Sequence, residues 1–95
     1  MALMFSLREF GQVFATRGRA AELREMALSR CADELVLTID FADVTNVSYS
    51  FADELVGKLA ADYPEGPQID LTNMTGTVEQ TVRRARERRT GVLAC

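Results

Sequence analysis

The nearly continuous apolar segment from Leu35 to Phe41 constrains the fold more than any other part of this chain. The segment is rich in β-branched residues, and only Thr38 and Asp40 in it are polar. Such strands are typical of the interior of a mostly parallel sheet, where both faces are covered. We therefore expect a central, doubly covered strand here, with Asp40 near its carboxyl end.

The segments before this strand predict a second strand and a helix. Over Leu3–Arg8 every second residue is a large apolar one (Leu3, Phe5 and Leu7), with Met4, Ser6 and Arg8 on the other side. This alternation indicates a half-buried strand, and Gly11 interrupts it. Residues Gln12–Ala15 fit either a short returning strand or a lead-in to a helix. Thr16 is a favourable N-cap for a helix over Arg17–Arg30.

A second helix is expected to begin at Ser50. Ser50 and Asp53 have the spacing of a capping box, with Asp in place of the usual Glu or Gln. The turn signal Tyr63–Pro67 ends this helix. Its predicted apolar stripe consists of Phe51, Leu55, Val56, Leu59 and Ala60.

A third strand is expected over Gln68–Thr72, and a last helix from about Thr75 or Thr77 to Arg89. A strand, helix and strand in this order imply a right-handed crossover and parallel pairing. The predicted class is α/β, a three- to four-stranded mostly parallel sheet covered by about three helices. The 95 residues suit one domain spanning 1–95.

Composition argues against catalysis and against a membrane. The chain has no histidine, which removes the commonest general base and metal ligand. Its carboxylates form no catalytic pair, so we expect no enzyme activity, no cofactor and no metal. No apolar run approaches the roughly 18 residues that a span needs, and the N-terminus has no basic leader. A cytoplasmic protein is therefore expected, with Cys31 and Cys95 as reduced thiols.

The carboxyl ends of the parallel strands should gather loops into a functional edge. This edge includes Asp40, the Thr45–Ser50 loop and the Thr72–Thr77 loop. The candidate partner-binding residues are Asp40, Thr45, Asn46, Tyr49, Phe51, Asp53, Asn73 and Thr75.

Two further features admit a structural and a functional interpretation. Ser50 is either a plain helix cap or a phosphorylation site, and Ser48 is an alternative acceptor. The arginine-rich run Arg83–Arg89 is either a solvated helix face or a surface for an acidic protein, a second copy of the chain or nucleic acid. The net charge of −3 makes nucleic acid the weaker choice.

The span LVLTIDFADVTNVSYSFADELVGKL resembles the STAS domain, the fold of bacterial anti-sigma-factor antagonists, and most closely an uncharacterised STAS-like branch. Asp40-Phe41 matches the family's strand end, and Val44 and Val47 fit the apolar loop positions. The segment Ser48–Phe51 lies where the family has D-S-S-G or D-S-T-G. Ser48 replaces the motif aspartate, Tyr49 the usual phosphoacceptor and Phe51 the glycine, so only the second hydroxyl is kept, as Ser50.

This resemblance implies a non-enzymatic regulatory module that binds a protein. In the family, the unmodified domain binds a kinase-like ATPase regulator, and phosphorylation breaks the complex. Ser50 would be the switch and Asp40 a support for the loop. One alternative is a homo-oligomeric scaffold such as a homodimer, supported by the apolar tail Val92–Leu93 and by the narrow apolar stripe of the last helix, Val78, Val82 and Ala85. The other is a nucleic-acid accessory protein that uses the Arg83–Arg89 helix.

Overall fold

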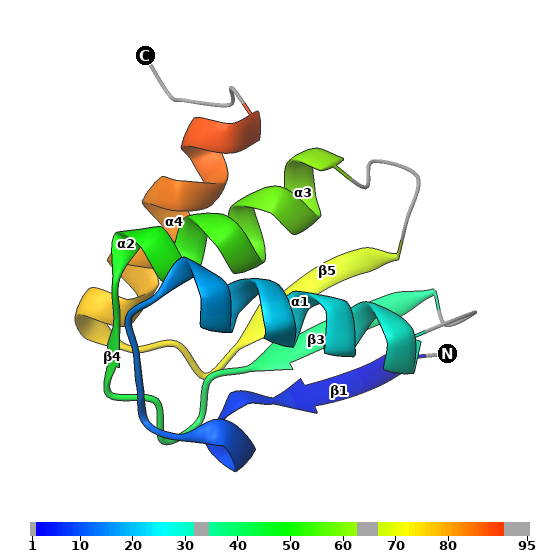
Figure 1. Cartoon of the computed structure of the whole chain (residues 1–95), viewed down its shortest axis with the longest axis horizontal. Coiled ribbons are helices and arrows are strands. Elements are labelled where there is room, and N and C mark those ends of the chain that lie inside the picture. Colours follow the sequence, from blue (N-terminus) through cyan, green and yellow to red (C-terminus); the bar gives the residue numbers. More distant parts are fainter. Residues whose placement is uncertain (1, 32–34, 63–66, 91–95) are drawn as a thin grey trace.

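The computed structural model describes residues 2–31, 35–62 and 67–90 of the chain (Figure 1). It confirms the predicted α/β class. The elements in chain order are β1 (Ala2–Ser6), the 3-10 turn η1 (Leu7–Phe10), β2 (Val13–Phe14), α1 (Arg17–Cys31), β3 (Val36–Asp40), β4 (Asn46–Val47), α2 (Tyr49–Ala52), the π-helical turn η2 (Asp53–Gly57), α3 (Lys58–Asp62), β5 (Gln68–Thr72) and α4 (Gly76–Thr90).

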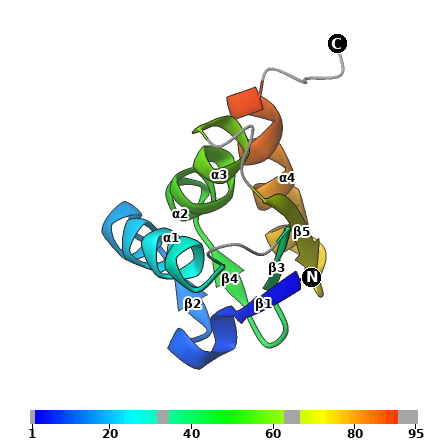
Figure 2. The same cartoon turned by 90° about the vertical axis from the view of Figure 1, so that its right-hand side faces the viewer.

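The main sheet has the order β1-β3-β5 and is parallel throughout, so β3 is the central strand as predicted. The prediction that both of its faces are covered is wrong. The helices lie on one side of the sheet (Figure 2), where Phe5, Leu37 and Ile39 are buried. On the opposite face Met4 is exposed and Thr38 is only half-buried. Strand β3 is therefore more apolar than its position requires, because only one of its faces packs against helices.

A second, two-stranded sheet settles the alternative left open for residues 12–15. Val13–Phe14 forms β2, which pairs in parallel with β4 in the register Val13–Asn46 and Phe14–Val47. The backbone N–H of Thr45 also donates to the carbonyl of Gln12 at 2.9 Å. The loop after β3 is thus tied to the segment that precedes α1.

Several element boundaries differ from the predicted ones by a few residues. The first strand ends at Ser6 rather than Arg8, because the chain turns into η1. The N-cap Thr16 is confirmed, since its Oγ1 accepts from the Arg19 backbone N–H at 3.2 Å. Strand β5 has the predicted bounds. The predicted turn over residues 63–67 lies mostly outside the described residues, as do the Val92–Leu93 tail and Cys95.

The core fills the space between the sheet and the helices. Elements α2, η2 and α3 follow one another without a break, and this helical stretch packs between α1 and α4. Its buried side chains include Phe51, Leu55, Val56 and Leu59, which is the predicted stripe apart from half-buried Ala60. The stripe of α4, Val78, Val82 and Ala85, is buried as well. Cys31, at the end of α1, is buried in this core.

Within the described ranges, no helix combines the length and the apolar character that crossing a membrane requires.

Candidate functional site

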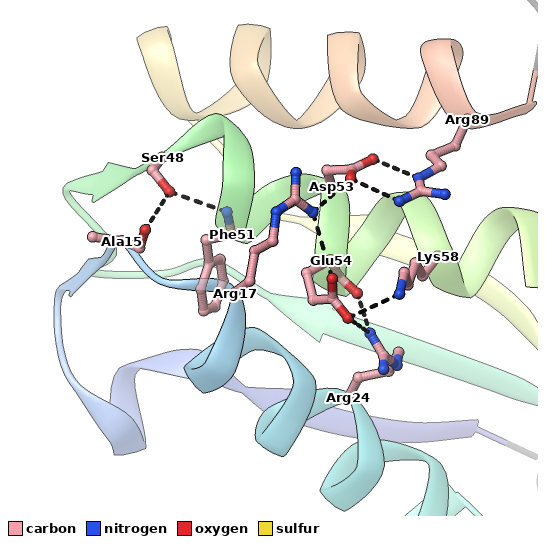
Figure 3. Close-up of polar contacts among 9 residues, drawn as sticks. All are labelled: Ala15, Arg17, Arg24, Ser48, Phe51, Asp53, Glu54, Lys58 and Arg89. Carbon is pink, nitrogen blue, oxygen red and sulfur yellow. Dashed lines mark hydrogen bonds and ion pairs between the residues drawn. The ribbon is translucent and has the colours of Figure 1, made fainter.

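The helix after the hydroxyl-rich loop begins two residues earlier than predicted, with Ser48 rather than Ser50 as its N-cap. Ser48 Oγ accepts from the Phe51 backbone N–H at 3.0 Å and donates to the Ala15 carbonyl at 2.8 Å (Figure 3). The predicted Ser50–Asp53 capping box is therefore wrong. Since the helix is already under way at Tyr49, the backbone N–H of Asp53 bonds within the helix to Tyr49 and Ser50 carbonyls.

Tyr49 and Ser50 occupy the surface at the start of α2. Tyr49 is 36% exposed, and Ser50 is half-buried. Among the described residues, none forms a hydrogen bond with the Ser50 hydroxyl, so this group is not part of the cap. The rim around Tyr49 thus reaches solvent, as an interaction role requires.

Phe51 cannot contact a partner, contrary to the prediction. Its side chain is fully buried, and its ring packs against that of Phe14 with 5.0 Å between centroids. The reason is the helical period, which places Phe51 on the same inward face as Leu55. Phe51 therefore anchors the helix to the hydrophobic core.

Asp40 and Asn73 come together at the carboxyl end of the main sheet. Asp40 is buried, and its Oδ1 accepts from the Ala42 backbone N–H and from Asn73 Nδ2, each at 2.9 Å. The Asn73 hydrogen bond, followed by the one from Ala42, lowers the pKa of Asp40. Asn73 has a positive φ of 59°, which asparagine tolerates better than most residues. Asp40 therefore braces two loops rather than facing a partner.

The remaining candidates are spread along this edge. Thr45 and Asn46 are exposed beside β2, and the Thr45 hydroxyl donates to the Gln12 carbonyl at 3.2 Å. Thr75 is exposed in the loop before α4. The structure places all three at the surface.

Asp53 belongs to a buried ion-pair cluster that sequence reasoning missed. Its side chain is only 8% exposed and is held between two helices. Arg89 of α4 binds it through Nε at 2.7 Å and Nη2 at 2.9 Å, and Arg17 of α1 binds it through Nη1 at 2.8 Å. The Arg89 hydrogen bonds, with those of Arg17, lower its pKa to about 2 against the opposing effect of burial.

Glu54 forms the other half of this cluster. Arg24 Nη1 donates to Glu54 Oε2 at 2.8 Å and also to the Glu54 backbone carbonyl. Lys58 Nζ lies 3.2 Å from Oε2, and Arg17 Nη1 lies 3.4 Å from Oε1. Figure 3 shows both carboxylates on the same helical stretch with cations from α1 and α4 around them. The Arg24 hydrogen bond is the main cause of the lowered pKa of Glu54.

Gly57 allows the close approach of α4 to this cluster. A Cβ at Gly57 would lie 2.8 Å from Arg89 Cγ, 3.0 Å from Asp53 Oδ1 and 3.3 Å from the Ala85 carbonyl oxygen. Gly57 also ends the π-helical turn that starts at Asp53, a type of turn often found at functional sites. Any side chain at this position would push Arg89 away from Asp53.

Two hollows flank the exposed ring of Tyr49. The larger one, of about 530 Å³, adjoins the ion-pair cluster. The smaller one, of about 220 Å³, lies toward the start of α4. We call the larger the arginine hollow, and it is lined by Arg17, Tyr49, Asp53, Arg88 and Arg89. We call the smaller the Tyr49 groove, and it is lined by Tyr49, Thr77, Gln80, Thr81 and Arg84.

In the described part of the chain, no three side chains of the types that bind metals are grouped closely enough to hold an ion. Besides the Asp53 carboxylate and the Gln80 amide, the described residues that line the two hollows carry guanidinium groups, hydroxyls and one phenol. They can bind anions and protein surfaces by hydrogen bonding.

Comparison with known proteins agrees with the fold. The family model of a STAS-like domain of unknown function (DUF4325) matches residues 20–79, which span α1, the central strand, the Tyr49 region and the start of α4. No curated protein and no solved structure matches the chain significantly.

Proposed function

Because this chain belongs to the STAS-like domain family of unknown function (DUF4325), we propose that it is a non-enzymatic regulatory module that binds another protein through the Tyr49 groove. The observation that supports this most directly is that Tyr49 is exposed and lines the groove together with residues of α4. Tyrosine is enriched at binding hot spots, because its ring buries apolar area while its hydroxyl keeps a polar partner.

The chemistry of α4 indicates what kind of protein surface would fit. Arg83 and Arg84 are exposed on this helix, and Arg84 lines the groove. Arg83 is paired with Glu79 at 3.3 Å, but Arg84 has no ion pair among the described residues. An acidic segment with one apolar contact for the tyrosine ring is therefore the expected partner surface. A kinase-like ATPase regulator, the partner type implied by the STAS resemblance, is the first candidate.

Affinity purification of the tagged chain from its native host tests this proposal. We expect Tyr49→Ala to lose its partner, with affinity reduced at least about tenfold, as for a hot-spot residue. Met4→Ser is the matched control, since Met4 is 59% exposed on the uncovered face of the sheet. If Tyr49→Ala captures the same proteins as the wild type, the groove is not the binding site. Light scattering of the purified chain distinguishes a second copy from a different partner.

Phosphorylation at Ser50 would add a switch to this module. A phosphate there would carry between one and two negative charges into the first turn of α2, where the helix dipole favours them. The same charge next to Tyr49 would repel an acidic partner. We expect Ser50→Asp to weaken binding with little change in Tm, and Ser50→Ala to bind normally. Undiminished binding by Ser50→Asp would exclude the switch but not the binding site.

A further inference from the structure

In the arginine hollow, arginines from distant parts of the chain lie together on one side of Tyr49. Arg17 comes from the start of α1, whereas Arg88 and Arg89 come from the last turn of α4. The overall net charge is −3, so this concentration is local and opposite in sign to the whole. A basic hollow with a protein wall on one side attracts anions more strongly than scattered surface charges do.

The cluster beneath the hollow keeps an excess of positive charge. Among the described side chains, the two carboxylates Asp53 and Glu54 are contacted by four cations. Arg88 adds a further positive charge at the rim and has no ion pair with any described residue. Within the described part of the chain, two carboxylates thus hold four cations in place. The four cations are Arg17, Arg24, Lys58 and Arg89.

Arg17 has donors left for a ligand. It contacts Asp53 and Glu54 through the same nitrogen, Nη1. None of the described residues accepts from its Nε or Nη2, and a guanidinium carries five N–H groups. Its side chain is 49% exposed. Its position is nevertheless held from the buried side by Asp53, so a ligand would not have to order this side chain.

From these observations we propose that the arginine hollow binds the phosphate group of a phosphomonoester, with Arg17 and Arg88 as its donors and Tyr49 alongside. Guanidinium groups match the oxygens of phosphate in paired hydrogen bonds, and a dianion suits the excess charge better than a carboxylate does. The volume of about 530 Å³ leaves room for the group that carries the phosphate, since ligand sites range from about 300 to 1,000 Å³.

This inference goes beyond the proposed protein-binding role, because the phosphate has two sources. It belongs either to a phosphorylated side chain of the partner or to a free phosphorylated small molecule. Both present the same oxyanion to Arg17 and Arg88. Among the described residues, the hollow and the groove have only Tyr49 in common, so their arginines can be tested separately.

Binding is measured on the full chain by NMR titration with inorganic phosphate, phosphoserine and a phosphoserine peptide. We expect saturable shifts at Arg17, Tyr49 and Arg88, with a dissociation constant of about 1 mM or tighter. Sodium chloride at matched ionic strength is the control. Identical shifts with chloride, or no saturable shift with any of the three probes, would overturn the proposal.

Matched arginine variants locate the site. We expect Arg88→Gln to weaken phosphate binding at least about tenfold with Tm unchanged, because one charge-assisted contact is lost. Arg84→Gln, one turn away on the same helix, should bind phosphate normally and weaken only partner binding. Normal phosphate binding by Arg88→Gln refutes the assignment and leaves the protein-binding role unaffected.

The source of the phosphate follows from the same titrations. A phosphopeptide that binds at least about tenfold tighter than phosphoserine assigns the phosphate to a protein. Equal affinities assign it to a small molecule. Either result requires the hollow to bind phosphate.

Discussion

Replacing Asp53 with asparagine should remove the negative charge that holds Arg17 and Arg89 while keeping the shape of the side chain. Asp53 is 8% exposed and accepts three hydrogen bonds from Arg17 and Arg89. An asparagine removes the negative charge that both guanidinium groups contact at this position, although Arg17 keeps Glu54 at 3.4 Å. Because their side chains are 49% and 36% exposed, water can reach them, so the loss should fall below the 3–5 kcal/mol typical of a broken, fully buried pair.

The pKa of Asp53 provides the magnitude. Its fall from 3.8 to about 2 on folding corresponds to about 2 kcal/mol of stability at neutral pH. A carboxyl with a lowered folded pKa contributes fully above its unfolded pKa and loses the contribution as the pH falls toward the folded value. Roughly half should therefore be lost by pH 3. For a domain of this size, 2 kcal/mol corresponds to a fall in Tm of roughly 10 °C.

Urea unfolding of the wild type and Asp53→Asn at pH 7 and pH 3 measures this effect. We expect a difference in unfolding free energy of about 2 kcal/mol at pH 7 and about half of that at pH 3. Glu54, whose pKa is also lowered, is present in both proteins and cancels in the comparison. A difference that is equal at the two pH values would show that the ion pairs are not its source. An Asp53→Asn, Arg89→Gln double-mutant cycle then isolates the coupling of that pair.

Two further predictions concern local structure. Gly57→Ala should destabilise the fold by about 1–3 kcal/mol, because the new Cβ would lie 2.8 Å from Arg89 Cγ and 3.3 Å from the Ala85 carbonyl oxygen. Gly18→Ala, with open space around it in α1, should instead stabilise the fold by about 0.5–1 kcal/mol in the same urea experiment. An equal effect at both glycines would contradict the close-approach argument. Ser48→Ala should cost about 1 kcal/mol through loss of the N-cap, and Ser50→Ala less than about 0.5 kcal/mol. A larger loss of stability in Ser50→Ala than in Ser48→Ala would show that Ser50, not Ser48, is the N-cap.

The strands and helices were predictable because each depends mainly on neighbours in sequence. The alternation before Gly11, the Thr16 cap and the stripe Val78, Val82 and Ala85 are local patterns, and the structure follows them. The N-cap was misplaced because two serines, Ser48 and Ser50, stand within one turn of the helix start. The deciding contact is the Ala15 carbonyl, 33 residues from Ser48 and invisible to local pattern.

The candidate site was predictable only in part. Tyr49 at an exposed rim followed from the strand–loop–helix order, because that order places the start of a helix at the carboxyl edge of a parallel sheet. Phe51 was wrongly included among the partner contacts, although the predicted apolar stripe had already placed it on the same inward face as Leu55 and Leu59. The arginine-rich run Arg83–Arg89 contains two of the residues that line the arginine hollow, Arg88 and Arg89, but no local pattern indicated that Arg17 would join them.

The sequence by itself determined the α/β class, the central position of β3 and the surface position of the hydroxyl-rich loop, because backbone hydrogen bonding and apolar periodicity act over short segments. Only the tertiary structure decided that Asp53 is a buried ion-pair partner rather than a capping group. Its cations Arg17 and Arg89 are each 36 residues away, and they meet it only because α1 and α4 pack against the same π-helical turn. Two charged side chains form an ion pair only when they lie close in space, and these side chains come close only once the helices have packed.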